Sequence, residues 1–298
     1  MPTSFSGINS IKNKQKRSSV LEKEKSEKRV ALKKRKREEK ESDVPRPKQT
    51  PRTLDNTRTA DSSVVAPGDE EVIRDEAEDE FSTIFDGALK PKIMLTTNIN
   101  PSTRSYPLIG GLIGLLPNAF YYRRQRFALR EIGGWAEEKG FTHLVVLMET
   151  RKEKFNLVVS RLPEGPTGCF RFSSPTLPEG IEGHGAATEH NPEILLNNFT
   201  TRLGRRVGRL LGSLFPHKPD FVGRQVVTMH NQRDYIFFRR HRYMFKEGGA
   251  GADLQELGPR FTLKPRWVLA GIFDPSEGEY EYMHKRTEMD ITKRTFHL

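Results

Sequence analysis

Short apolar runs recur along the chain only after about residue 90, and they define its organisation. Residues 20–41 instead combine Glu and Lys at spacings that favour a solvated helix, and they offer no apolar face to bury. Because so little apolar surface precedes residue 90, we expect the folded part of the chain to begin near Lys92.

The first half of the folded part is predicted to be mostly β-structure. Continuous apolar runs rich in β-branched and aromatic side chains are typical of buried strands. Such runs occupy residues 93–97, 144–148, 155–160 and 169–172. Residues 127–139 carry apolar side chains between charges and predict a helix that Gly140 closes, while residues 165–168 predict a turn.

The second half is predicted to repeat this theme after a loop at residues 173–193, which are rich in Gly, Pro and Ser. Pro192 is expected to open a helix that runs to about residue 214. The later elements are a hairpin of residues 225–230 and 235–240 around the turn 231–234, a flexible linker at 248–251, and a last strand at 266–273.

The predicted helix over 194–214 combines an apolar face with a basic stripe. Its apolar residues recur at steps of three and four, at Leu196, Phe199, Leu203, Val207, Leu210, Leu211 and Leu214. The stripe on its other faces consists of Arg202, Arg205, Arg206 and Arg209. Because guanidinium groups match phosphate bidentately, we favour phosphate contact for this stripe. The alternative is an ordinary amphipathic helix whose arginines are solvated.

Glycine recurs every fourth residue in the same segment, at Gly204, Gly208 and Gly212. Each glycine costs about 1 kcal/mol of helix stability relative to alanine. Something should offset this cost, and the close approach of another backbone, from protein or RNA, would do so.

The predicted hairpin carries a second candidate site, in which basic residues lie among aromatic rings. The basic residues are Arg224, Arg233, Arg239, Arg240 and Arg242, and the rings are those of Tyr235, Phe237, Phe238, His241 and Tyr243. Such mixtures are common on RNA-binding surfaces, where basic groups bind the backbone and rings stack on bases. The alternative is that the phenylalanines face a core or a partner and the arginines are solvated. We expect at least one of the two phenylalanines to be core.

A third and weaker patch of the same character follows the first predicted strand. It consists of Tyr122, Arg123 and Arg124, followed by Gln125 and Arg126. We include its first three residues among the candidate RNA contacts.

Composition strengthens the expectation of a polyanionic partner. The 298 residues are 35% hydrophobic and 30% charged, with a net charge of +11 and a pI of about 9.7. Such a field attracts polyanions, of which nucleic acid is the commonest for a basic protein, with acidic membranes second. The apolar content is enough for one stable domain of roughly 200 residues.

The charge is arranged in blocks. Residues 1–52 hold 17 Lys or Arg against 7 Asp or Glu, residues 53–90 hold 3 against 11, and residues 91–298 hold 30 against 21. The acidic block at 69–80 is interpreted as a solvating linker, or as a cover on a basic surface until RNA displaces it. A run of five basic residues predicts a nuclear localisation signal or an RNA-contacting patch, and the alternative is a merely solvated charge run. The run consists of Lys33, Lys34, Arg35, Lys36 and Arg37.

Several function classes find no support in the sequence. No apolar run approaches the roughly 18 residues that span a bilayer, and the N-terminus lacks the apolar core of a secretory signal. Cys169 is the only cysteine, which excludes an internal disulfide and a cysteine-based zinc site. His184 and His190 are interpreted as surface histidines, and no phosphate-binding glycine loop or nucleophile–base pair is evident. We therefore expect an intracellular protein with no catalytic residue, metal, cofactor, small-molecule substrate or membrane partner.

Several motifs, in order along the chain, resemble those of the Brix-domain family of ribosome assembly factors. They are LTTN (95–98) with PS (101–102), PNA (117–119) with YY (121–122), LPEGPT (162–167), NFTTRLG (198–204), GRQVVT (223–228), HNQRD (230–234) and FFR (237–239). The resemblance covers roughly residues 90–283. Gly110, Gly111 and Gly114 depart from it, because the family usually has a polar helix there.

The resemblance implies an α/β fold. It implies a Brix domain of two halves related by a pseudo-twofold axis, resembling the anticodon-binding domain of some tRNA synthetases. The expected organisation is a disordered charged tail at residues 1–90, basic and then acidic, a Brix domain at 91–283, and a C-terminal extension at 284–298.

The resemblance also implies binding of pre-ribosomal RNA, nucleolar residence and work with a protein partner. We expect a non-catalytic scaffold in maturation of the large ribosomal subunit, with its pre-rRNA, pre-ribosomal proteins and a dedicated assembly factor as partners. One alternative is an RNA-processing enzyme such as a nuclease, which would need a carboxylate cluster for magnesium. The other is a protein-binding adaptor whose basic surface meets an acidic partner.

Overall fold

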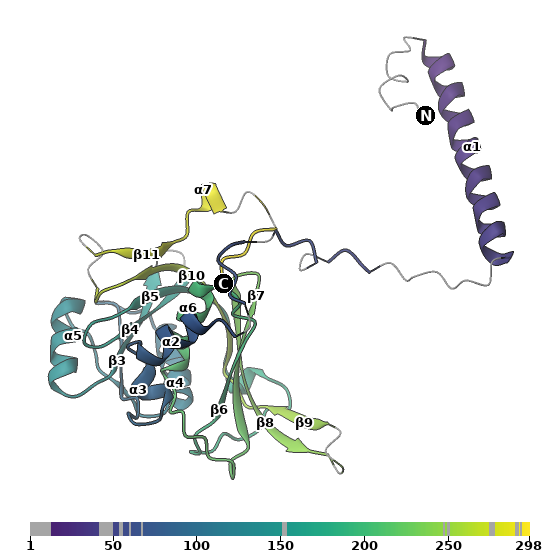
Figure 1. The fold of residues 1–298 in the computed structure, drawn as a ribbon. Helices are drawn as coiled ribbons and strands as arrows, with labels where there is room; N and C mark the ends of the chain where they lie inside the picture. The colour runs from purple at the N-terminus through teal and green to yellow at the C-terminus, as the bar shows by residue number, and fades with distance from the viewer. Residues whose placement is uncertain are drawn as a thin grey trace. The chain divides into compact units, whose positions relative to one another are not determined.

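The chain divides into two compact units, Met1–Thr53 and Leu54–Leu298, and each is described separately (Figure 1). The computed structural model describes residues 13–41, 50–53, 56–59, 61–66, 68–150, 154–246, 248, 251–273, 278–289, 292 and 294–298. Within this described part, no helix is both long enough and apolar enough to cross a bilayer.

The first unit contains one long helix, α1 (Lys14–Glu41). The Asn13 side chain accepts hydrogen bonds from the backbone N–H groups of Gln15 and Lys16, which caps the first turn. Val30 and Leu32 are exposed, so the helix has no buried face there. The helix predicted at 20–41 is therefore confirmed, although it begins six residues earlier. The run 33–37 lies in its second half.

The second unit is built on one mixed sheet (Figure 1). Its strands are β1 (Ile93–Thr97), β2 (Ala119–Tyr121), β3 (His143–Thr150), β4 (Lys154–Arg161), β5 (Thr167–Thr176), β6 (Glu193–Asn197), β7 (Gln225–Gln232), β8 (Tyr235–Phe245), β9 (Ala252–Glu256), β10 (Arg260–Leu269) and β11 (Tyr280–Met283). The order across the sheet is β2-β1-β3-β4-β5-β10-β8-β7-β6, with β9 paired to β8 and β11 paired to β10.

The strand order is symmetric about the antiparallel pair β5–β10. On one side β1 and β3 are parallel, and β4 and β5 follow antiparallel. On the other side β6 and β7 are parallel, and β8 and β10 follow antiparallel. A helix follows the first strand of each half. The expected α/β fold of two pseudo-twofold-related halves is confirmed.

Helices cover both faces of the sheet. They are α2 (Glu70–Glu78), α3 (Ser82–Phe85), α4 (Ser105–Leu115), α5 (Leu129–Glu138), α6 (Arg202–Gly212) and α7 (Arg286–Met289), with a 3₁₀ turn at Pro178–Gly180. In β3, Val145 and Leu147 belong to the core beneath α4 and α6, whereas the alternate residues Leu144 and Val146 belong to a smaller core beneath α5. We call the face that bears α5 the outer face.

The helix predicted at 192–214 is wrong over residues 192–201. Residues of that stretch form β6, which pairs parallel with β7, and the helix begins only at Arg202. Asn198 has a left-handed φ of 64°, and the Thr201 hydroxyl caps the helix by accepting the Gly204 N–H at 2.8 Å. Asn198 ends the strand and Thr201 starts the helix, although the apolar spacing of three and four residues continues through both elements.

The later elements match the predicted pattern with shifted ends. The predicted hairpin is present as β7–β8, but its turn is shorter than the expected 231–234 and consists of Arg233 and Asp234, both with positive φ. The last predicted strand, 266–273, corresponds to β10, which begins at Arg260 and ends at Leu269, and β11 follows it. Residues 249–250 of the predicted linker lie outside the described residues, and the strands beside them, β8 and β9, are paired.

The compact unit begins at Leu54, well before the expected boundary at residue 90. Phe81 and Ile84 are fully buried in it, and Val64 forms an isolated antiparallel β-bridge with Thr201. The segment between residues 54 and 90 thus contributes buried apolar residues to the sheet unit, although Val64 itself stays exposed.

Candidate nucleic-acid interface

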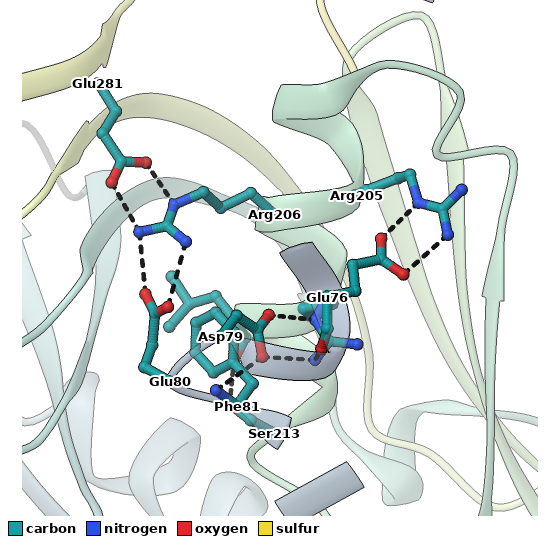
Figure 2. Close-up of polar contacts among 10 residues, drawn as sticks. Glu76, Asp79, Glu80, Phe81, Arg205, Arg206, Ser213 and Glu281 are labelled. Atoms are coloured by element: carbon teal, nitrogen blue, oxygen red, sulfur yellow. Dashed lines mark hydrogen bonds and ion pairs between the residues drawn. The ribbon is translucent and has the colours of Figure 1, made fainter. Parts of the chain in front are cut away.

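Carboxylates of the acidic block compensate the arginine stripe of α6 (Figure 2). Arg205 meets Glu76 at 2.5 Å, and Arg209 meets Asp79 at 2.5 Å. The hydrogen bond with Glu76 raises the pKa of the Arg205 guanidinium. The acidic helix α2 and the residues just after it therefore lie directly on the basic helix.

The other two arginines of the stripe are also paired. Arg206 bridges Glu281 at 2.6 Å and Glu80 at 2.9 Å (Figure 2). Arg202 meets Glu71 at 3.1 Å on the surface, with 56% of its side chain exposed. In this structure all four guanidinium groups bind carboxylates. Phosphate contact by the stripe stays a prediction, and it would require displacement of these carboxylates.

The Arg209–Asp79 pair is the most enclosed of these contacts. Each side chain is 13% exposed, and the guanidinium carbon of Arg209 lies 4.3 Å from the centre of the Phe85 ring. Arg209 also donates to the backbone carbonyl of Glu76 at 2.8 Å. These contacts give Arg209 a structural role in fastening the segment that contains α2 and α3.

The hairpin residues divide between the two faces of the sheet. Phe238 is buried and stacks on Phe261 with ring centres 4.4 Å apart, which confirms that one phenylalanine is core. Arg240 lies on the same side and is buried, donating to the Gln225 side chain and, at 3.0 Å, to the Gly114 carbonyl. Burial lowers the pKa of the Arg240 guanidinium. Arg240 is therefore enclosed by protein groups.

The remaining hairpin arginines are accessible to solvent to differing degrees. Arg233 at the turn and Arg224 before β7 are exposed, and Arg239 lies on the outer face, partly exposed. Arg242 donates to the Ala186 carbonyl at 3.1 Å. These four stay candidates for RNA contact.

The third patch lies at the far end of the sheet from the hairpin, because β2 and β6 are its two edges. Tyr122 packs edge-on against Phe141, with ring centres 5.9 Å apart. Arg124 donates to the Phe127 carbonyl at 3.1 Å, and Arg123 is exposed. The sheet does not bring this patch together with the other candidates.

A row of polar residues on the outer face runs across three strands at the middle of the sheet. Asn156, Arg171 and Lys264 are direct partners across β4, β5 and β10. Their neighbours Leu157 and Phe170 point into the opposite core, so the row faces outward. At its end, the Lys264 ammonium lies 5.2 Å from the centre of the Tyr235 ring.

This row is the floor of a basic trough of about 570 Å³. The trough is lined by Thr150, Lys154, Asn156, Arg171, Tyr235, Lys264, Arg266, His284 and Arg286. None of these lining residues is a carboxylate. The register shift between Pro265 and Trp267 makes Arg266 an extra residue in β10, and it is exposed. The trough therefore concentrates positive charge in a concave surface.

An aromatic cavity of about 450 Å³ adjoins the trough and shares Tyr235, Lys264 and His284 with it. Its lining residues are Gln232, Arg233, Asp234, Tyr235, Phe237, Lys264, His284, Met289, Thr292, Thr295, Phe296 and His297. The β7–β8 turn forms one wall, and the C-terminal segment forms another.

Most trough residues were missed by sequence reasoning, because they come from separate strands. The signal for Lys264 was the alternation of residues 260–264, in which Phe261 and Leu263 are buried and Thr262 and Lys264 are not. Arg171 carries the same signal, because it alternates with the buried Phe170 and Phe172, but only strand register places it beside Asn156 and Lys264. Among the described residues, no group of three or more His, Cys, Asp or Glu side chains could hold a metal ion.

Comparison with known proteins gives consistent matches. The Brix domain family model matches residues 99–267. The chain is 48% identical over 303 residues to "Ribosome production factor 1" of Mus musculus, covering 100% of this chain and 86% of that protein. It is 44% identical over 249 residues to "Ribosome production factor 1" of Saccharomyces cerevisiae, covering 83% and 80%. A probable ribosomal biogenesis protein from Aeropyrum pernix K1 aligns with a TM-score of 0.44 and 16% identity, covering 58% of this chain and 96% of that one.

Proposed function

Because this chain belongs to the Brix-domain family and is a ribosome biogenesis factor, we propose that it binds precursor rRNA of the large subunit as a non-catalytic scaffold. The basic trough carries this proposal. It is concave, it holds five Lys or Arg side chains, and none of its lining residues is acidic. A concave surface of one charge sign focuses the field and attracts a polyanion.

The trough supports RNA binding better than the α6 stripe does. The stripe is already neutralised by Glu71, Glu76, Asp79, Glu80 and Glu281, so phosphate would have to displace several ion pairs. Phosphate that enters the trough would displace no ion pair with a lining carboxylate, because the lining contains none. The exposed hairpin residues Arg224, Arg233, Arg239 and Arg242 are proposed to extend the contact.

We further propose that the protein works in the nucleolus with pre-ribosomal proteins and a dedicated assembly-factor partner. The run 33–37 supports the nuclear location, since five consecutive basic residues are typical of a localisation signal. Replacing this run with alanine in a fluorescent fusion should move the protein out of the nucleus. Retained nucleolar signal would remove the run from this role.

Binding of RNA by the full chain, measured over a salt series, tests the trough directly. Arg171→Ala with Arg266→Ala should weaken binding and reduce the slope of log K against log salt by about 1.4, at roughly 0.7 for each lost contact with single-stranded phosphate. Lys90→Ala with Arg130→Ala removes the same net charge from other exposed positions and is the matched control. An equal effect of both pairs would mean that the trough is not the binding surface.

Depletion of the protein in cells tests the biological role. Large subunits should fall and their rRNA precursors should accumulate, and the full chain should restore both where the trough variant does not. Normal precursors and normal subunits after depletion would contradict the proposed role in large-subunit maturation.

A further inference from the structure

The aromatic cavity opens beside the basic trough, so one chain of RNA could occupy both. The two share the side chains of Tyr235, Lys264 and His284. Its volume of about 450 Å³ lies within the range of roughly 300–1,000 Å³ that small-molecule pockets occupy. It is therefore far too small for a double helix, although a single nucleotide is of the right scale.

The rings in the cavity are positioned for stacking. Tyr235 and Phe237 are alternate residues of β8 and point to the outer face, while Ile236 and Phe238 point into the core. Phe296 contributes a third ring to the lining. Tyr235 is 43% exposed, so an entering group can reach its ring. Aromatic rings on an open sheet face are a common platform for unstacked RNA bases.

The wall contributed by the C-terminal segment is held in place by hydrogen bonds. Asp234 Oδ1 accepts the backbone N–H of His297 at 2.7 Å and that of Leu298 at 2.9 Å. The Phe296 carbonyl accepts from Arg58 at 3.2 Å. The cavity is therefore formed before any ligand enters, which lowers the entropic cost of binding.

We propose that the aromatic cavity takes one unstacked base from an RNA whose backbone lies in the basic trough. This inference rests on the proposed function, because it requires that the trough bind RNA. Bases inside a duplex are stacked and paired, so the cavity selects RNA with an unpaired nucleotide, such as a bulge. The trough supplies affinity, and the cavity supplies this preference.

The test uses the full chain and two labelled RNA hairpins that differ by a single bulged adenosine. The bulged hairpin should bind roughly ten-fold more tightly, the scale of one base stacked on aromatic rings. A third hairpin carries an abasic nucleotide at the bulge, which keeps the backbone and removes the base. It should bind like the fully paired hairpin. Equal affinity of the abasic and adenosine hairpins would overturn the inference without any change to the protein.

Variants then locate the effect. Phe237→Leu keeps an apolar side chain and removes the ring, so it should abolish the preference while affinity for the paired hairpin stays the same. Phe221→Leu is the control, because Phe221 is exposed and precedes β7, at the end opposite the cavity. Thermal unfolding of both variants checks that each is folded. If Phe237→Leu keeps the preference, the base does not enter this cavity.

The outcomes separate this inference from the proposed function. If paired and bulged RNA bind with equal affinity and the trough variant loses this binding, the cavity inference alone is overturned. No measurable binding of any hairpin would overturn both.

Discussion

His143 lies at the start of β3 and joins it to the end of α6. Its two ring nitrogens are each 2.9 Å from a hydroxyl oxygen, Nδ1 from that of Thr142 and Nε2 from that of Ser213. Burial lowers the pKa of His143 to about 3, and the nearby positive charge of Arg161 contributes. The ring is therefore neutral in the folded protein at any pH well above 3.

This pKa predicts a loss of stability in mild acid. The unfolded chain takes up a proton at this residue near pH 6.5, and the folded chain does so only near pH 3. The stability from the neutral ring is complete above pH 6.5 and falls as pH decreases toward 3, by about 2 kcal/mol between pH 7 and pH 5. Urea unfolding at these two pH values measures it.

His143→Gln retains an amide near the Ser213 hydroxyl and cannot titrate. The difference in unfolding free energy between pH 7 and pH 5 should therefore shrink by about 2 kcal/mol in this variant. An unchanged difference would place the acid sensitivity at other groups.

Gly204 shows why glycine occurs in a helix that would otherwise favour alanine. A Cβ at this position would lie 2.6 Å from the carbonyl carbon of Leu298, which is backbone and cannot rotate away. The close approach expected for the glycines of this segment is here made by protein backbone.

Alanine substitution should therefore act in opposite directions at two helical glycines. Gly204→Ala should lower the melting temperature despite a gain of about 1 kcal/mol in helix propensity. Gly134→Ala in α5, where a Cβ meets nothing within 4 Å, should raise it. A higher melting temperature for Gly204→Ala would mean that the C-terminal segment moves aside at little cost.

At the scale of elements, α2 and α6 are held together by charge. Arg209→Ala leaves Asp79 mostly buried without its cation, and we expect a loss of about 2–3 kcal/mol, below the roughly 3–5 kcal/mol for a fully buried pair. Arg202→Ala removes an exposed, solvent-screened pair and should lower the unfolding free energy much less than Arg209→Ala does. Chemical denaturation of the two variants gives both values.

The charge swap of Arg209→Asp with Asp79→Arg separates pairing from packing. It should recover part of the stability that either single reversal loses. No recovery would mean that the packing of Arg209 on Phe85 matters more than the ion pair.

Elements with a single uninterrupted pattern could be predicted from the sequence, and elements with a mixed pattern could not. The strands β1, β3, β4 and β5 and the hairpin β7–β8 follow from apolar runs and turn residues. The strand β6 was assigned to a helix because Leu196 and Phe199 continue the apolar spacing of α6 into extended chain. The helix α4 was implied only by the family resemblance and not by its own pattern, since three glycines lower its propensity and its apolar burial offsets them only in the fold.

At the scale of the whole molecule, sequence charge blocks did not reveal which charges face one another. The acidic block was interpreted as a linker or as a cover for a basic surface, and in the structure its carboxylates lie on α6. The basic trough arises from strand register between β4, β5 and β10, so no local segment contains it. The family and the two-half architecture could be inferred from motifs, whereas the candidate site required the sheet.

The pairing of β5 with β10 also has a kinetic consequence. The two strands lie at the centre of the sheet, yet roughly 90 residues of chain separate their partnered ends. At about 5–20 residues per second, a translating ribosome needs roughly 5–20 s to supply β10 after β5 has emerged. During that interval β5 is an unpaired strand edge, a surface prone to aggregation. We therefore expect the nascent first half to depend on chaperones, and the complete sheet to fold slowly because its central contact is non-local.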